Sequence, residues 1–258
     1  MIEKQTPEYG PLAGPPKDVR RLWLVRHGVT EWNLQRRFCG QSDQPMIEAG
    51  RQQAAWMAAL LASRPLERIY SSDLCRAAET ASLIAAKQAK PQEIQTTAAL
   101  RELSFGAWEG LTYAQAAAQS TGQTSFFKDP EGHAPPGGET LAAGVQRLST
   151  FITQAVQEAE TPAPTSGQTR GEWLIVSHGG VMRGFLCSLL GMPLHNEWQL
   201  KIGHGALSAL DVVFEDDKLF AAVNLLNLQP PAEFVAGPDG QALETASMRS
   251  GTGALPHA

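Results

Sequence analysis

Two histidines in this sequence stand directly after short apolar runs that are typical of buried strands. Arg26 and His27 follow the run at residues 22–25, and His178 follows the run at residues 173–176 after a single serine. In a mainly parallel sheet, functional side chains collect just beyond the carboxyl ends of the strands, where the chain leaves the sheet for a helix. An arginine and two histidines at one such edge predict a small pocket that holds a phosphoryl group.

A phosphoryl-transfer pocket needs fixed cations, a nucleophile and a proton donor. The transferring group carries nearly two negative charges, and the planar fork of an arginine can grip two of its oxygens while it stays protonated. A histidine that forms a covalent intermediate divides one difficult displacement into two easier ones, and a carboxylic acid then protonates the leaving oxygen. A second arginine and a carboxylic acid are therefore expected near the same edge.

A third strand-to-helix junction supplies another arginine, and the junction at His178 also supplies anion-binding amides. Arg76 lies in the first turn of a predicted helix after a short strand at residues 68–71, so its guanidinium can reach back over the sheet edge. Gly179 and Gly180 open the helix that follows His178, and the free amides of a helix N-terminus favour an anion. Three junctions that converge on one edge are stronger support than any single motif.

Glu102 is the preferred candidate for the acid. It follows a weaker strand at residues 93–97. A partly buried carboxyl group beside a bound phosphate stays protonated near neutral pH, as a proton donor requires. Glu109 is the competing choice.

The elements that must position these residues alternate between strand and helix. Such alternation predicts a three-layer α/β/α fold, with a mainly parallel sheet and an antiparallel strand near the C-terminal end. We expect one domain at residues 21–228, a flexible leader at 1–20 and a poorly ordered tail at 229–258. Ser72 or Asp73 is expected to cap the second helix. The predicted strands are 22–26, 68–71, 93–97, 173–176, 206–214 and 219–225, the last two forming a hairpin, and the predicted helices are 49–61, 73–87, 140–158 and 181–190.

Composition excludes several classes of function. The formal charge is 21 minus 26, or -5, without any block of like charge, so no nucleic-acid partner is expected. The 3 cysteines are far apart, which argues against a disulfide framework or a structural zinc site. No signal peptide or membrane span is recognised, so we expect a cytoplasmic protein with no membrane partner. Oligomeric state does not follow from the sequence.

The octapeptide at residues 26–33, RHGVTEWN, resembles the signature of the histidine phosphatase superfamily, also called phosphoglycerate-mutase-like. The segments at 72–77, 102–110 and 178–179 follow in the family's order, so the resemblance covers about residues 22–225. It implies that His27 is the phosphorylated nucleophile and that Glu102 is the general acid. The remaining implied site residues contact the phosphoryl group or substrate, and they are Arg26, Asn33, Gly40, Arg76, His178 and Gly179.

Departures from the mutase pattern favour a hydrolase. Mutases of the family carry Glu-Arg-His-Tyr-Gly at the acid motif, whereas this chain has ELSFG at 102–106, and WEG at 108–110 is similar to alpha-ribazole phosphatases and other broad phosphatases. Residues 111–140 lack the paired arginines that mutases use for a second phosphate and offer only Lys128. We therefore expect a phosphatase that hydrolyses a small phosphorylated metabolite through a phosphohistidine, without metal or other cofactor.

Alternatives from the same residues are a phosphoglycerate mutase and a non-catalytic phospholigand-binding protein. A metal site made of His27, His178 and His204 lacks a carboxylate partner and close ligand spacing, so we discount it. His204 stands between two glycines before a predicted strand, and we leave it out of the expected site.

Overall fold

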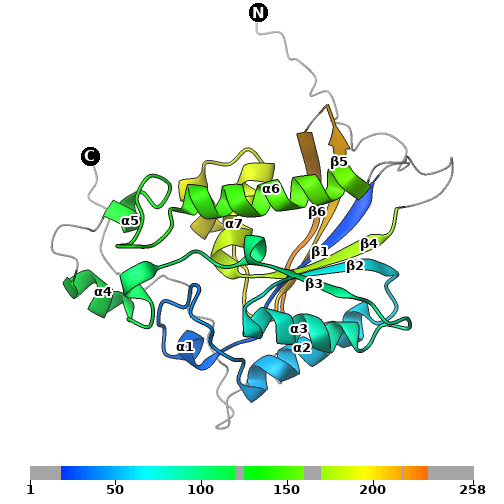
Figure 1. Cartoon of the computed structure of the whole chain (residues 1–258), viewed down its shortest axis with the longest axis horizontal. Helices are drawn as coiled ribbons and strands as arrows, with labels where there is room; N and C mark the ends of the chain where they lie inside the picture. Colours follow the sequence, from blue (N-terminus) through cyan, green and yellow to red (C-terminus); the bar gives the residue numbers. More distant parts are fainter. Residues whose placement is uncertain (1–18, 120–124, 160–169, 217, 232–258) are drawn as a thin grey trace, which may run out of the picture.

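A single mixed sheet forms the centre of the protein (Figure 1). The computed structural model describes residues 19–119, 125–159, 170–216 and 218–231. The strand order across the sheet is β3-β2-β4-β1-β5-β6. The strands are β1 (Arg20–Arg26), β2 (Leu66–Ser72), β3 (Ile94–Thr97), β4 (Glu172–Ser177), β5 (Leu207–Glu215) and β6 (Lys218–Leu228).

Only β5 runs against the direction of the other strands in this sheet. The pairs β1–β4, β2–β4 and β2–β3 are parallel, whereas β5 is antiparallel to both β1 and β6. The start of β5 therefore lies at the same edge as the carboxyl ends of β1 and β4. This confirms the predicted fold class, including the antiparallel strand near the C-terminal end.

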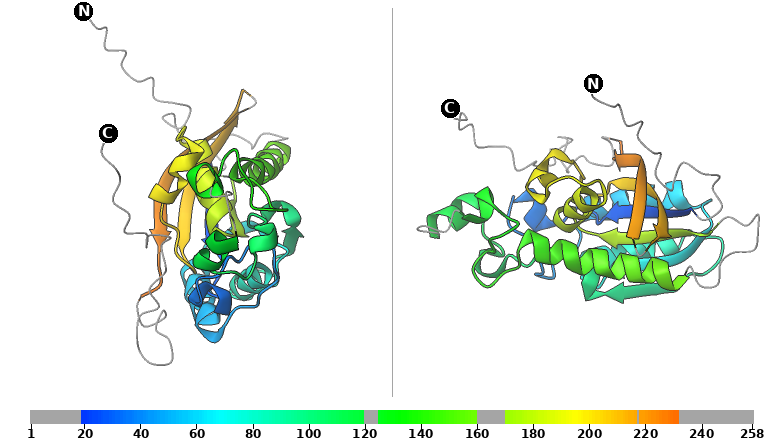
Figure 2. Two further views of the ribbon diagram at one scale, coloured as in Figure 1. Left: turned by 90° about the vertical axis from the view of Figure 1, so that its left-hand side faces the viewer. Right: turned by 90° about the horizontal axis from the view of Figure 1, so that it is seen from above.

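Helices cover both faces of the sheet (Figures 1 and 2). The pair α2 and α3 packs over one buried apolar cluster, and the pair α6 and α7 packs over the other. The predicted apolar stripe of α6 is buried, since Leu141, Val145 and Leu148 are each at most 4% exposed. The four helices are α2 (Glu48–Leu61), α3 (Cys75–Ala85), α6 (Leu141–Ala159) and α7 (Gly179–Leu189).

Three short helices and three 3₁₀ segments were not predicted from the hydrophobic pattern. Figure 1 shows α1, α4 and α5 beyond the carboxyl ends of the strands. They are too short for a helical period to show in the sequence. These segments are α1 (Glu31–Leu34), α4 (Tyr113–Gln119), α5 (Ser125–Lys128), η2 (Ala98–Leu100), η3 (Gly106–Trp108) and η4 (Leu194–Gln199).

The predicted cap of α3 is wrong. The helix begins at Cys75, two residues later than expected, and its N-cap Leu74 makes no side-chain cap hydrogen bond. Asp73 instead pairs with Arg101 at 2.6 Å, and the amide of Cys75 donates to Asp43 at 2.7 Å. The carboxylate of Asp43, which is distant in the sequence, thus accepts the hydrogen bond from the Cys75 amide that a local cap would have accepted.

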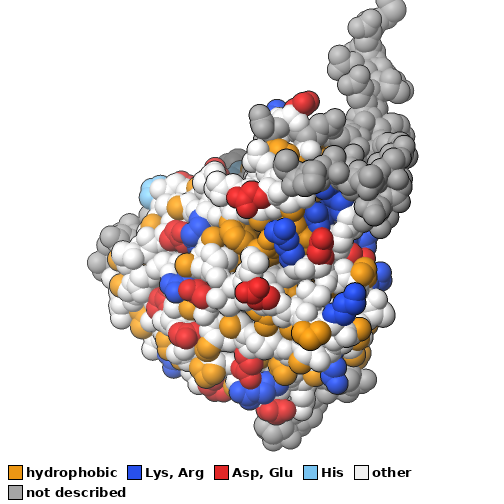
Figure 3. Space-filling model, turned by 45° about the vertical axis from the view of Figure 1, so that its right-hand side comes forward, with side chains coloured by type: hydrophobic (Ala, Val, Ile, Leu, Met, Phe, Trp, Pro, Cys, Tyr) orange, Lys and Arg blue, Asp and Glu red, His pale blue; other side chains and the backbone are white. Residues whose placement is uncertain are grey.

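The ends of the chain are only partly described. Strand β1 begins at Arg20, within the predicted leader, and β6 ends at Leu228, where the tail was expected to begin. The other expectations for the leader and tail fall largely on residues 1–18 and 232–258, outside the described part. No helix of the described residues is both long and apolar enough to cross a membrane. On the face in Figure 3, Lys and Arg side chains are interspersed with Asp and Glu side chains.

Candidate active site

His27 leaves the end of β1 with its imidazole almost fully buried, at 3% exposure. Its Nδ1 lies 2.7 Å from the carbonyl oxygen of Gly28. A carbonyl can only accept, so Nδ1 carries the proton and the lone pair belongs to Nε2. Burial, and then the charges of Arg76 and Arg26, lower the pKa of His27 well below its usual value. His27 is therefore a neutral imidazole with its lone pair on Nε2, the nitrogen that can act as a nucleophile and that accepts a hydrogen bond from Arg76 at 3.3 Å.

Arg76 faces that nitrogen from the first turn of α3. It is 0% exposed, and its Nε lies 3.3 Å from Nε2 of His27. Its Nη1 donates to the carbonyl of Ser42 at 2.9 Å, and its Nη2 donates to the carbonyl of Gly40 at 2.5 Å. The outer end of the guanidinium is thus fastened to a loop, while its Nε edge is turned toward His27.

Arg26 is fastened in a similar way by other partners. Its Nη1 donates to the carbonyl of Ile202, and its Nη2 donates to Nε2 of His204, each at 2.6 Å. Its Nε is buried without a hydrogen-bond partner in the described structure. Burial, and then the charge of Arg183, lower the pKa of Arg26 to about 10, so it remains a cation at neutral pH.

His178 is the N-cap of α7 and is 0% exposed. Its ring centroid lies 5.0 Å from that of His27. Burial, and then the charge of Arg76, lower its pKa well below the usual value. Neither ring nitrogen has a hydrogen-bond partner among the described residues, which is unusual for a buried polar side chain.

The side chains of Arg26, His27, Arg76 and His178 therefore meet at one edge, and we call them the cationic cup. Two guanidinium charges and two neutral imidazoles line it. Because the imidazoles are neutral, the two positive charges of the cup balance the two negative charges of a phosphate dianion. Arginine donors and unpartnered ring nitrogens in a buried space are suited to an anion with several acceptor oxygens.

Glu102 lies where α7 begins, beside the cup. Its Oε2 accepts from the amide of Gly180 at 2.9 Å, and its Oε1 accepts from the amides of Val181 and Leu103 at 3.0 and 3.1 Å. The carboxyl group is 8% exposed. A Cβ added at Gly180 would lie 2.7 Å from Oε1, so a larger residue there would displace the carboxyl group from this position. The free amides of the helix N-terminus hold the carboxyl group in a fixed orientation.

Glu109, the competing candidate, is engaged elsewhere. Its oxygens accept from the amides of Gln41 and Ser42 at 2.7 and 2.6 Å, and from that of Phe105 at 3.2 Å. It therefore fastens the loop at residues 40–42, whose carbonyls hold Arg76. In the described part of the chain, the hydrogen bonds of the Glu109 carboxylate all go to backbone amides, and none goes to a side chain of the cup.

The other predicted site residues have mixed surroundings. Gly179 packs against Arg26, since a Cβ there would lie 2.8 Å from the guanidinium carbon. Gly40 contributes its carbonyl to Arg76. Asn33 accepts from the amide and hydroxyl of Thr30 at 3.0 and 2.9 Å, and within the described residues it forms no hydrogen bond to the cup.

His204 is the residue that the sequence prediction missed. Its ring centroid is 5.8 Å from that of His27, and it accepts a hydrogen bond from Arg26. The amide of Gly205 donates to the carbonyl of His27 at 3.1 Å, because β5 starts beside the end of β1. The signal that could have identified His204 is its position just before β5, the strand that pairs antiparallel with β1.

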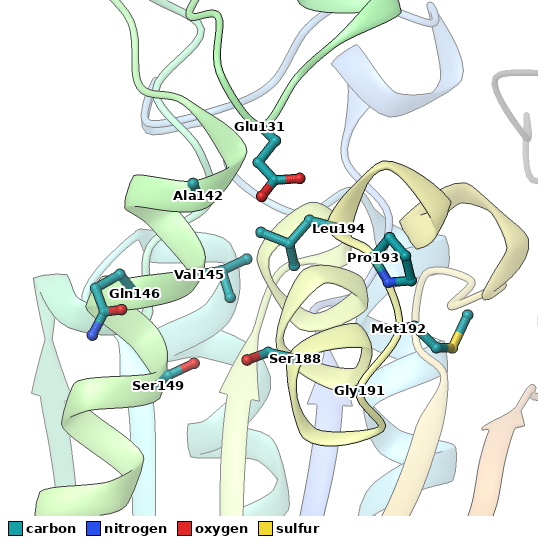
Figure 4. A pocket seen from close by; sticks show the side chains of 10 residues that line it. All are labelled: Glu131, Ala142, Val145, Gln146, Ser149, Ser188, Gly191, Met192, Pro193 and Leu194. Atoms are coloured by element: carbon teal, nitrogen blue, oxygen red, sulfur yellow. The ribbon is translucent and has the colours of Figure 1, made fainter.

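A cavity of about 520 Å³ lies between α6, α7 and the segment at residues 191–194 (Figure 4). Its lining includes Glu131, Gln146 and Leu194, and none of the cup residues. In the described part of the chain, no cluster of three or more His, Cys, Asp or Glu side chains is arranged to hold a metal ion.

Known proteins resemble this chain over most of its length. A glucosyl-3-phosphoglycerate phosphatase of Mycolicibacterium vanbaalenii is 35% identical over 190 residues, which is 74% of this chain and 82% of that protein. An adenosylcobalamin/alpha-ribazole phosphatase of Salmonella typhimurium is 32% identical over 80% of this chain and 96% of its own length. The solved structure of a mycobacterial glucosyl-3-phosphoglycerate phosphatase superposes with a TM-score of 0.71 at 28% identity, covering 81% of this chain and 99% of that one.

The family model of the histidine phosphatase superfamily (branch 1) matches residues 22–225, which include every residue of the cup. The match extends from the first strand of the sheet into the last. This chain belongs to the histidine phosphatase superfamily.

Proposed function

We propose that this protein is a phosphatase that hydrolyses small phosphomonoesters through a phosphohistidine at His27. One observation carries the proposal: His27 is buried and neutral, its Nδ1 is bound to a carbonyl, and its Nε2 faces a guanidinium at 3.3 Å. A neutral imidazole beside fixed cations can attack a phosphorus atom whose oxygens those cations hold.

In the first step, the lone pair of His27 Nε2 attacks phosphorus in line as the bond from phosphorus to the alcohol oxygen breaks. Arg26, Arg76 and His178 hold the other three oxygens. Glu102 gives its proton to the departing oxygen. Its Oε2 accepts only one amide hydrogen bond and so has a lone pair left for that proton.

In the second step, a water molecule attacks phosphorus and the phosphorus–nitrogen bond breaks. Glu102 takes a proton from the attacking water, inorganic phosphate leaves, and His27 regains its neutral form. The same carboxyl group therefore acts first as an acid and then as a base.

The named relatives support a small phosphorylated metabolite as substrate, since they are a glucosyl-3-phosphoglycerate phosphatase and an alpha-ribazole phosphatase. The scarcity of cations at residues 111–140 favours hydrolysis over mutase chemistry. Product analysis separates the two: a phosphatase releases free phosphate from phosphoglycerate, whereas a mutase returns the isomer and responds to a bisphosphate primer.

The decisive experiment replaces the nucleophile. His27→Ala should lower kcat/KM for phosphomonoesters by at least about 10³-fold, because the covalent route is lost. Rapid quench of the unaltered protein should trap an acid-labile, alkali-stable phosphate on His27, and EDTA should leave turnover unchanged. The control is His195→Ala, a histidine on the exposed side of η4. Turnover without a trapped adduct, or turnover that EDTA abolishes, would disprove the mechanism.

A further inference from the structure

We infer that His204 is a positioning residue that holds Arg26 in the orientation needed to bind the phosphoryl group. This inference rests on the proposed function, and it assigns a role to a residue outside the recognised motifs. The observation behind it is the 2.6 Å contact between Nη2 of Arg26 and Nε2 of His204.

The direction of this hydrogen bond follows from the chemistry of the pair. A guanidinium only donates, so Nε2 of His204 must accept and its proton must be on Nδ1. Burial, and then the charge of Arg26, lower the pKa of His204 well below its usual value. The imidazole is therefore neutral, and it can accept from Arg26 without adding a positive charge.

The backbone that carries His204 is fastened on both sides. The amide of Gly203 donates to Asn227 at 2.7 Å, and the amide of Gly205 donates to the carbonyl of His27 at 3.1 Å. Earlier in the same segment, Glu197 of η4 forms an ion pair with Arg183 of α7. His204 is half-buried, and it therefore offers its ring from a fixed point of the backbone.

The contact with His204 is one of two that fix the guanidinium of Arg26. One N–H of Nη1 goes to the carbonyl of Ile202 and one N–H of Nη2 goes to His204, which fixes the plane of the guanidinium. The Nε–H remains buried and unpartnered in the described structure, on a cation that packs against Gly179. With one of its two outer acceptors removed, the guanidinium is free to turn this donor edge away from the cup.

The test is the binding of inorganic phosphate, measured by isothermal titration calorimetry on the full chain. His204→Leu keeps a similar volume and removes the acceptor, and it should weaken phosphate binding about tenfold, the equivalent of one lost hydrogen bond to a charged group. His204→Gln places an amide oxygen close to the position of Nε2, and it should bind phosphate within about threefold of the unaltered protein. His195→Leu is the matched control, because it makes the same substitution at an exposed position in η4.

Steady-state kinetics provide the second readout. His204→Leu should lower kcat about tenfold as well as raise KM, because Arg26 acts on both the bound and the transferring group, and His204→Gln should restore both. If His204→Leu fails to fold, His204→Asn replaces it, since the shorter amide cannot reach Nη2 of Arg26. The proposal is wrong if the Leu variant binds phosphate like the control, or if Gln does no better than Leu. The titration needs no turnover, so failure of the proposed phosphatase activity would leave this test intact.

Discussion

The two arginines of the cup are held by different kinds of partner. Arg76 is fastened by two backbone carbonyls, those of Gly40 and Ser42, on a loop that Glu109 binds through two further amides. Arg26 is fastened by one carbonyl and by the ring of His204. Arg76 is fully buried and Arg26 is half-buried, and each keeps its Nε edge away from these anchors.

The orientations of the two arginines therefore depend on different parts of the chain. The Arg76 side depends on the shape of one loop, and that shape depends on a carboxylate that never reaches the cup. The Arg26 side depends on a titratable ring from a segment more than 170 residues away along the chain. The guanidinium of Arg76 is thus held by main-chain groups, whereas that of Arg26 is held in part by an imidazole that must stay neutral.

The largest effect is expected from replacing Arg76 by lysine. The three donors of an ammonium group radiate from one nitrogen, so they cannot reach the two carbonyls and His27 that the three nitrogens of Arg76 reach, and Arg76→Lys should lower kcat/KM by roughly 10³-fold. Arg26→Lys should have a smaller effect, because no atom of Arg26 is hydrogen-bonded to His27. Steady-state assays with one phosphomonoester measure both variants, and thermal melts check that they fold. Equal losses of kcat/KM in the two variants would contradict the distinction drawn between Arg76 and Arg26.

A smaller effect is expected at Glu109, whose role differs from that of Glu102. Glu109→Gln keeps one acceptor oxygen but loses the charge that binds the loop amides, so kcat/KM should fall about tenfold as Arg76 becomes less well held. The loss should be the same for an alkyl phosphate and for p-nitrophenyl phosphate. Glu102→Gln should instead harm the alkyl phosphate far more, because only a poor leaving group needs a proton. A leaving-group dependence in the Glu109 variant would make Glu109 the acid.

The smallest effect concerns stability at low pH. His27, His178 and His204 have lowered pKa values in the folded protein, so below about pH 6.5 the unfolded chain binds more protons and the free energy of unfolding falls as the pH falls. Each histidine contributes a slope of up to about 1.4 kcal/mol per pH unit. Denaturant titrations between pH 5 and 6.5 should show a shallower slope for His204→Gln, whereas between pH 8 and 9 the two slopes should agree. An unchanged slope below pH 6.5 would mean that His204 is charged in the folded state.

Local sequence pattern was sufficient for the strands that carry the cup. Strands β1 and β4 are buried on both faces, so they read as continuous apolar runs, and the residues just after them were identified as functional candidates. The long helix α6 was predicted from its apolar stripe, and the hairpin of β5 and β6 from two runs around a polar turn. The helices α1, α4 and α5 were not predicted, because four to seven residues do not establish a period.

The sequence by itself determined which side chains reach the edge of the sheet, because the end of a buried strand and the start of the next helix are encoded locally. It also indicated the chemistry, since the octapeptide at residues 26–33 and the segments that follow it resemble the motifs of the histidine phosphatase superfamily. Only the tertiary structure decided what holds these groups: His204 against Arg26, the loop carbonyls against Arg76, and Glu109 beneath that loop. Those contacts join segments that are distant in the chain, and their geometry depends on how the whole sheet packs.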